Sequence, residues 1–195
     1  MLTDSPWSDL SLVDFCKGLA DDSTGAEGAP AARLLAATGA GLAAAAQRAG
    51  CTSESAVYAN GRADELDALR ERALARLETS RDVCEKLNRK PEGADLEKWC
   101  KRRVELVLET VELAVAALRI SAVGAFDIEV EPAGDLAVAA GVLTAAAHAT
   151  AAEVKRSVDA VSDTEWGERH RLAAGVLMEE ASALLIEIQT ETSKS

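Results

Sequence analysis

The sequence predicts an all-α protein built as an elongated antiparallel bundle of about six helices. Apolar residues recur at helical spacing through most of the 195 residues, and glycine and proline gather in a few short breaks. Only six residues are aromatic (two Phe, three Trp and one Tyr), so alanine, leucine and valine must fill the core. Small side chains let helix axes approach to about 8 Å, which makes long helix contacts the main source of stability. We expect a single domain over residues 1–195, with flexible ends at 1–7 and 192–195.

The first two helices are predicted on either side of a break that contains glycine. Ser11 and Asp14 have capping-box spacing, with Asp in place of the preferred Glu or Gln, and favour a short first helix. Pro30 suits the first turn of a second helix, which continues through small residues. The expected elements are a helix from 11 to about 21, a break at 22–28, a helix from 30 to about 49 and a polar loop over 50–61.

Two longer helices follow, over about 62–89 and about 95–123, separated by a break at Pro91 and Gly93. In the second of them, Glu105, Glu109 and Glu112 fall at i, i+4 and i+7 and form one acidic stripe. The stripe is either a solvated face or a row of carboxylates that lines a cleft for a cationic ligand. Periodicity does not decide between these two interpretations.

A short segment then leads to a helix that is almost wholly alanine and aliphatic. The alternation of apolar and acidic residues over 124–132 is too short to predict a strand, and we interpret it as a loop. The fifth helix is expected to open near Asp135 and to reach about Val161, and Ser162 to Glu165 open a sixth helix that reaches about Glu191. Carboxylates are rarely buried without a partner, so Asp135 is either a helix cap or a functional group at the mouth of a pocket.

The charge balance excludes several classes of partner. The net charge is −12, spread along the chain without a basic block, so nucleic acid and anionic membrane surfaces would repel the protein. The apolar stretches 31–46 and 133–152 are too short or too rich in alanine for membrane spans, and they carry Arg33, Asp135 and His148. We therefore expect neither a membrane nor a nucleic acid as partner.

Familiar catalytic and metal-binding motifs are absent. The sequence has no Gly-x-x-x-x-Gly-Lys phosphate loop, no Gly-x-Ser-x-Gly elbow and no His-Glu-x-x-His pair. The only histidines, His148 and His170, have neither a second histidine within one turn nor a cysteine nearby, so no metal site is expected. Four widely separated cysteines and the lack of a signal peptide indicate reduced thiols in a cytoplasmic protein.

Four stretches together carry a resemblance to a known family. They are LVDFCKGLA at 12–20, GAPAARLLAATGAGL at 28–42, ELDALRER at 65–72 and GDLAVAA at 134–140. In order and spacing they resemble the opening helix, the glycine-rich loop with its small-residue helix, the third helix and the Ser-Asp-x-x-Val-Ala-Ala signature of the cyclodeaminase/cyclohydrolase family. The family includes the cyclodeaminase domain of formiminotransferase-cyclodeaminase and bacterial methenyltetrahydrofolate cyclohydrolases. The resemblance implies an all-helical homodimer that opens or closes a C–N bond at a one-carbon unit of folate bound in a cleft.

Departures from the family pattern imply a changed substrate. The family's loop reads Pro-Gly-Gly-Gly-Ser, and its glycines let backbone amides approach an anionic ligand. Here residues 26–30 read Ala-Glu-Gly-Ala-Pro, which retains Gly28. Pro30 removes an N–H donor, and Glu27 adds a negative charge where a folate carboxylate would be repelled.

Three further positions follow from the same resemblance. Gly134 replaces the signature serine, and Glu131 stands where an asparagine is expected. In the third helix, Ser80 aligns with an Asp that the family places near its active cleft. Asp135 is retained, and by resemblance it orients substrate or moves a proton at the C–N centre.

The resemblance thus implies Asp135 and Ser80 as catalytic residues and a substrate pocket lined by Glu27, Gly28, Pro30, Glu131 and Gly134. No metal and no cofactor is required, although a tetrahydrofolate derivative remains a candidate substrate. We expect a small-molecule enzyme that makes or breaks a C–N bond, on a substrate diverged from folate in a specialised biosynthetic pathway. The alternatives are an ordinary methenyl- or formimino-tetrahydrofolate enzyme, and a non-catalytic helical dimer that binds a ligand or a partner protein.

Overall fold

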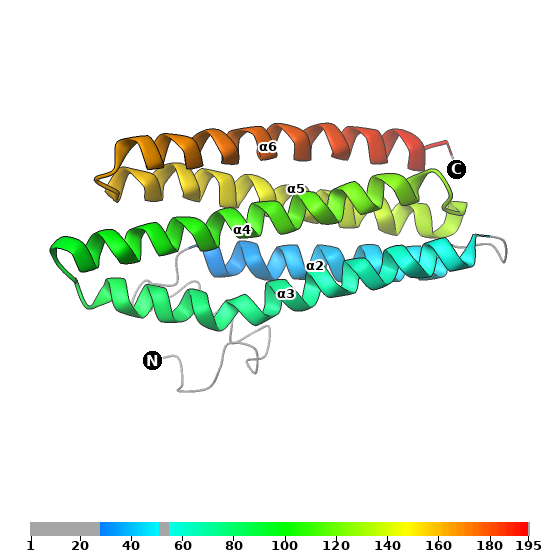
Figure 1. Cartoon of the computed structure of the whole chain (residues 1–195). Coiled ribbons are helices and arrows are strands. Elements are labelled where there is room, and N and C mark those ends of the chain that lie inside the picture. The colour runs from blue at the N-terminus through cyan, green and yellow to red at the C-terminus, as the bar shows by residue number, and fades with distance from the viewer. Residues whose placement is uncertain (1–27, 51–54, 195) are drawn as a thin grey trace.

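The computed structural model describes residues 28–50 and 55–194, which form an elongated bundle of long helices (Figure 1). Each helix runs antiparallel to the one before it. The described elements are α2 (Gly28–Ala49), α3 (Ala56–Asn88), α4 (Gly93–Ala125), α5 (Val130–Ser157), the short 3-10 helix η3 (Val158–Ala160) and α6 (Thr164–Thr192). The all-α prediction is confirmed, with five α-helices in the described residues rather than six. The helix expected over 11–21 lies outside the described residues.

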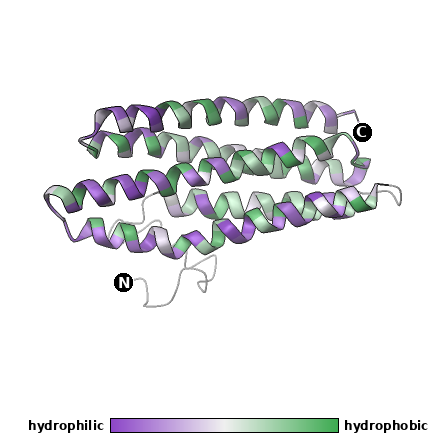
Figure 2. Ribbon diagram, viewed as in Figure 1, coloured by the Kyte–Doolittle hydropathy of each residue, from purple (hydrophilic) through white to green (hydrophobic). Residues whose placement is uncertain are grey.

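Helix α5 is central to the bundle. It packs against α2, α4 and α6, while α2 also packs against α3 and α4. The core is formed mainly by alanine, valine and leucine, as expected from the few aromatic residues. Figure 2 shows that α4 is largely hydrophilic towards its start and more hydrophobic towards its end. The largest apolar core therefore lies where α4, α5 and α2 run side by side.

Two connections are shorter than the sequence predicts. Helix α3 begins at Ala56, so the second half of the loop expected over 50–61 is helical, and α5 begins at Val130 rather than near Asp135. Pro132 is the third residue of α5, where a missing N–H costs no helical hydrogen bond. The backbone N–H of Glu129 donates to the carbonyl oxygen of Gly50 at 3.1 Å, which ties the loop before α5 to the end of α2.

Arg33 fastens three helices together from inside the core. Its side chain is buried, with 1% of the residue exposed. Its Nε donates to Thr110 Oγ1 at 2.9 Å and its Nη1 to the carbonyl oxygen of Arg76 at 3.0 Å, while Nη2 donates to the carbonyl oxygen of Leu106. Burial lowers the pKa of Arg33 to about 10, so the guanidinium stays charged at neutral pH.

The acidic stripe of α4 is a solvated face. Glu105 and Glu112 are exposed. Glu105 pairs with Arg102 at 3.0 Å, and Glu109 pairs with Arg76 at 3.3 Å. The two arginines pair with these carboxylates on the outside of the bundle. This favours a solvated face over a row of carboxylates that lines a cleft.

Helix α5 with η3, over Val130–Ala160, is long and apolar enough by length and composition to cross a membrane, with a mean hydropathy of 1.3 in its most apolar window. Within the bundle, 56% of that window is buried. Core helices of soluble proteins pass the same test of length and hydropathy. The apolar character of α5 is thus accounted for by its central position.

Candidate functional site

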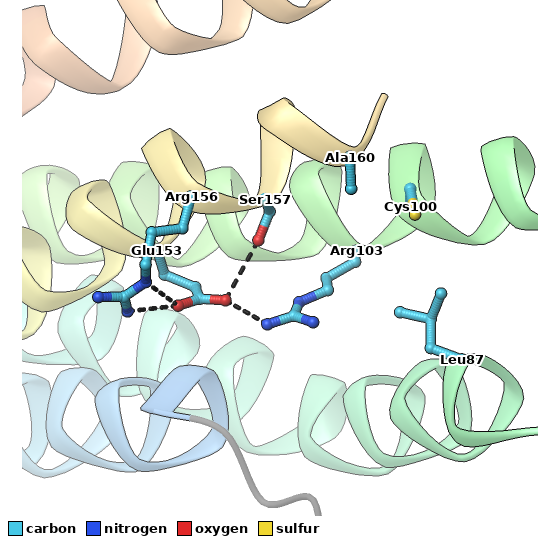
Figure 3. Close-up of a pocket in the computed structure, with 7 residues that line it drawn as sticks. All are labelled: Leu87, Cys100, Arg103, Glu153, Arg156, Ser157 and Ala160. Atoms are coloured by element: carbon cyan, nitrogen blue, oxygen red, sulfur yellow. Dashed lines mark hydrogen bonds and ion pairs between the residues drawn. The ribbon is translucent and has the colours of Figure 1, made fainter. Parts of the chain in front are cut away.

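The described pocket that contains a buried carboxylate lies at the end of the bundle where α2 and α4 begin and α3 and α5 end. Helix α2 has 22 residues, whereas α3 and α4 have 33 each. In the described part of the chain, no other helix continues the line of α2 beyond Gly28. A pocket of about 470 Å³ occupies this end of the bundle (Figure 3), which we call the open end. It is lined by Leu87, Cys100, Arg103, Glu153, Arg156, Ser157 and Ala160.

The pairing of α2 with α5 places the start of α2 beside this pocket. A Cβ atom on Gly39 would lie 2.7 Å from Leu143 Cγ, and one on Gly50 would lie 2.6 Å from Pro132 Cγ. Because the two helices are antiparallel with the same rise per residue, these contacts put Gly28 to Pro30 level with Glu153. The first turn of α2 therefore borders the open end.

Glu153 is the central polar group of the pocket. Only 4% of the residue is exposed. Its Oε1 accepts hydrogen bonds from Arg103 Nη2 and from Ser157 Oγ, the latter at 3.1 Å. Its Oε2 accepts from Nε of Arg156 at 3.1 Å and from Nη2 of the same guanidinium. Figure 3 shows the carboxylate between the two arginine side chains, which reach it from α4 and α5.

The surrounding arginines keep this carboxylate charged. Burial by itself would raise the pKa of Glu153, but the hydrogen bonds from Arg156 and Arg103 outweigh it and hold the pKa below its ordinary value. Two guanidinium groups and one carboxylate give the described lining residues a net charge of +1. The described lining is thus positive in a protein whose net charge is −12.

The thiols near the pocket are poor nucleophiles. Cys100 is buried in the wall and Cys84 is half-buried. Burial raises the pKa of both thiols, and the carboxylate of Glu153 raises that of Cys84 further. Both stay protonated at neutral pH, so neither supplies a thiolate. The described residues contain no group of three or more His, Cys, Asp or Glu that could hold a metal ion.

The sequence-predicted site residues form two separate groups in one chain. Gly28 and Pro30 lie in the first turn of α2, at the open end. Ser80 of α3 lies close to their level, because Arg33 of α2 reaches the carbonyl oxygen of Arg76, one turn before Ser80. Ser80 is buried, and its hydroxyl donates to that same carbonyl oxygen at 3.0 Å. Glu27 lies outside the described residues.

The second group, Glu131, Gly134 and Asp135, lies near the start of α5 and is exposed. From Asp135 to Glu153 the helix extends roughly 27 Å at 1.5 Å per residue. The expected convergence of Asp135 with Ser80 and Gly28 therefore does not occur within one chain. Consecutive helices reverse direction, which puts the end of α3 and the start of α5 at opposite ends of the bundle (Figure 1).

Capping does not explain Asp135. It is the sixth residue of α5, beyond the first turn, and the N-cap residue is Glu129, which makes no side-chain cap bond. Among the described residues, Asp135 takes part in no hydrogen bond and no ion pair. Asp135 is exposed, where water solvates a carboxylate without a protein partner, so its place in the single chain assigns it no role.

Sequence reasoning missed Arg103, Glu153 and Arg156. Glu153 and Arg156 look like an ordinary surface pair at i and i+3, and Arg103 is far away in the sequence. One signal was available: Glu153 continues the buried face of α5 formed by Ala139, Leu143, Ala146 and Thr150. A carboxylate at that position requires a partner from another helix.

The fold has a close structural counterpart, although the sequence by itself has none. No protein-family model and no curated protein matches the sequence. A crystal structure of formiminotetrahydrofolate cyclodeaminase from Thermotoga maritima matches with a TM-score of 0.88 and 13% sequence identity, over 95% of this chain and 97% of that chain. The fold implied by the sequence resemblance is confirmed, and the chain has the fold of formiminotetrahydrofolate cyclodeaminase.

Proposed function

We propose that the protein is a small-molecule enzyme of the cyclodeaminase/cyclohydrolase type, which makes or breaks a C–N bond at the open end of the bundle. The observation that carries this proposal is the match of the whole fold to formiminotetrahydrofolate cyclodeaminase. The pocket beside the first turn of α2 supports it, because this turn corresponds to the family's glycine-rich loop. Cyclisation, ring opening and addition–elimination at a C=N centre are the reactions that fit such an enzyme.

The substrate of this enzyme differs from folate. Pro30 is buried in the first turn of α2, where the family's loop offers backbone N–H groups to its ligand. Arg103 and Arg156, with Glu153 between them, provide the polar groups of the pocket instead. A specialised biosynthetic pathway in the cytoplasm would account for such a change of substrate.

A second copy of the chain accounts for a surface of α2 and α5 that no other described helix covers. Both helices present small and aliphatic side chains at alternating spacings of three and four residues, the pattern of a helix-packing seam. This surface, which we call the seam face, consists of Leu35, Thr38, Leu42 and Ala45 of α2 and Asp135, Val138, Val142, Ala145, Ala149 and Ala152 of α5. All of these residues are exposed except Val142, which is half-buried. We therefore propose a homodimer that buries the seam face.

Charge favours an antiparallel arrangement of the two copies. The exposed carboxylates Glu129, Glu131 and Asp135 gather at one end of α5, and the exposed cation Lys155 lies at the other, next to Arg156, which is paired with Glu153. A parallel dimer would bring like charges together, whereas an antiparallel dimer pairs the acidic end with the basic end. The two-fold axis then passes near Val142, which is close to the midpoint of the seam face on α5.

This dimer would unite the two groups of predicted site residues. With the axis near Val142, Asp135 of the partner subunit lies level with Ala149 to Ala152, about one turn from Glu153. It therefore borders the open end, beside Gly28 and Pro30. In this arrangement the partner carboxylate orients the substrate or moves its proton.

The function is tested with a panel of formimino compounds, including formiminotetrahydrofolate, and of cyclic amidines, including methenyltetrahydrofolate. Ammonia release measures deamination of the formimino compounds, and the change in absorbance measures ring opening of the cyclic amidines. We expect turnover of a non-folate member, reduced at least about 100-fold in Asp135→Asn because a general acid–base group contributes on that scale. Glu112→Gln, an exposed carboxylate on α4, is the matched control and retains activity.

Two outcomes would contradict the proposal in different ways. Rapid hydrolysis of methenyltetrahydrofolate that depends on Asp135 would identify an ordinary folate enzyme. Absence of turnover on the whole panel, together with a stable dimer, would identify the non-catalytic alternative.

A further inference from the structure

We propose that the pocket at the open end binds an organic anion, whose carboxylate or phosphate group contacts Arg156 and whose apolar part lies along Leu87, Cys100 and Ala160. The inference deepens the proposed function by naming the charge of the substrate, and it rests on that function only for the ligand's role as substrate. Binding itself can be measured without any reaction.

The carboxylate of Glu153 uses its hydrogen-bonding capacity within the protein. Its two oxygens accept four hydrogen bonds, from Arg103, from Ser157 and twice from Arg156. A carboxylate offers about four lone-pair sites, so little capacity remains for a ligand. Glu153 is therefore a positioning residue, which holds the two guanidinium groups and does not attract a cation.

Arg156 retains donors for a ligand. A guanidinium has five N–H donors, and Arg156 presents only Nε and Nη2 to Glu153. No hydrogen bond within the described residues uses its Nη1, and 70% of the side chain is exposed. A guanidinium edge that is fixed on one side by a carboxylate is preorganised to bind a planar or tetrahedral anion on the other.

The rest of the pocket suits the uncharged part of such a ligand. Leu87, Ala160 and the thiol of Cys100 form an apolar wall opposite the arginines (Figure 3). Burial raises the pKa of the Cys100 thiol, which stays neutral and does not repel an anion. A volume of about 470 Å³ is that of a site for one small molecule.

The test uses the full chain and four small probes of similar shape. Benzoate and phenyl phosphate carry the two candidate anionic groups, benzamide is neutral and benzylamine is cationic. Binding is followed by calorimetry and by the NMR signals of the arginine Nε–H groups. We expect both anions to bind at least about tenfold more tightly than benzamide and benzylamine, because a hydrogen bond to a charged group contributes on that scale. The tighter of the two anions identifies the group that the site prefers.

Substitutions distinguish binding of the anion at Arg156 from nonspecific attraction of the anion to arginines on the surface. Arg156→Gln is expected to weaken benzoate binding at least tenfold, whereas Arg119→Gln, which removes a bidentate arginine paired with Glu180 elsewhere, leaves it unchanged. Glu153→Gln makes the pocket more positive but frees the guanidinium groups. If Glu153 positions them, this variant weakens anion binding, and tighter binding would overturn that role. Circular dichroism confirms that each variant is folded.

Equal affinity for benzoate and benzamide, or unchanged binding in Arg156→Gln, would overturn the anion site. These results are separable from a failure of the proposed function. Anion binding without turnover on the amidine panel leaves the pocket assignment in place, and turnover without anion binding refutes the pocket assignment alone.

Discussion

Two buried charges, Arg33 and Glu153, are held in different ways. Arg33 donates to one hydroxyl and two backbone carbonyl groups and has no hydrogen-bonded carboxylate, which suits a residue that fastens α2 to α3 and α4. Glu153 accepts from two cations, one of which extends into solvent. The hydrogen bonds of Arg33 are all made within the core of the protein. The arrangement around Glu153 leaves a guanidinium edge available, which is why we assign binding to it.

Glu153 should contribute to stability in a way that depends on pH. The arginines hold its folded-state pKa below the unfolded value, so the contribution is present above the unfolded pKa of about 4.3 and is lost as the pH falls through the folded value. We expect Glu153→Gln to lower the free energy of unfolding by about 2–3 kcal/mol at pH 7 and by less at pH 3. Urea unfolding at both pH values measures the difference. Glu112→Gln should change neither value, and an equal loss at both pH values for Glu153→Gln would contradict the ionic explanation.

The helices themselves were largely predictable, because local signals mark their ends. Pro91 and Gly93 separate α3 from α4, and Asp163 accepts a hydrogen bond from the backbone N–H of Trp166 at 3.0 Å as the N-cap of α6. The start of α5 was placed too late, since the alternating residues before Pro132 resemble a loop or a strand. Proline in a first turn was the stronger signal.

The position of one helix along its axis relative to a neighbouring helix was not predictable from periodicity. A shift by a whole turn preserves the apolar face of a helix, so the pattern does not reveal that Glu153 meets Arg103. The family resemblance assigned Asp135 and Ser80 to one cleft. Short antiparallel connections, however, place them at opposite ends of a single chain (Figure 1). The candidate site thus depends on tertiary contacts, and in the proposed dimer a second copy completes it.

Substitution of glycines within single helices tests whether the seam face is closely packed in a dimer. A Cβ atom on Gly141 of α5 or on Gly175 of α6 would meet no atom within 4 Å in the protomer. Since alanine stabilises a helix interior by about 0.5–1 kcal/mol over glycine, the protomer gains from either substitution. We expect Gly175→Ala to raise the free energy of unfolding by that amount. Gly141→Ala, beside Val142 on the seam face, should instead weaken the dimer when its mass is measured on dilution. Equal stabilisation without dissociation would refute close packing there.

At the scale of the whole molecule, the bundle combines a net charge of −12 with an apolar surface along α2 and α5. The negative charge disfavours association in general, so a dimer must exploit the places where charge is absent or complementary. The seam face offers both, because its centre is uncharged and its two ends differ in sign. A mass near 20.4 kDa by light scattering, the value for a single chain, would exclude the dimer.

Engineered disulfides decide how the two copies are oriented. A residue on a two-fold axis meets its own counterpart, so Val142→Cys should form an intermolecular disulfide under mild oxidation. In the antiparallel dimer, Asp135→Cys should not link to itself but should link to Ala149→Cys when the two variants are mixed and allowed to exchange subunits. Non-reducing gels, with the unsubstituted chain as the control for its native cysteines, distinguish these products. Self-linking of Asp135→Cys would indicate the parallel arrangement and would remove the partner's Asp135 from the open end. The mixed disulfide would instead place that carboxylate beside the pocket that Glu153 and its two arginines line.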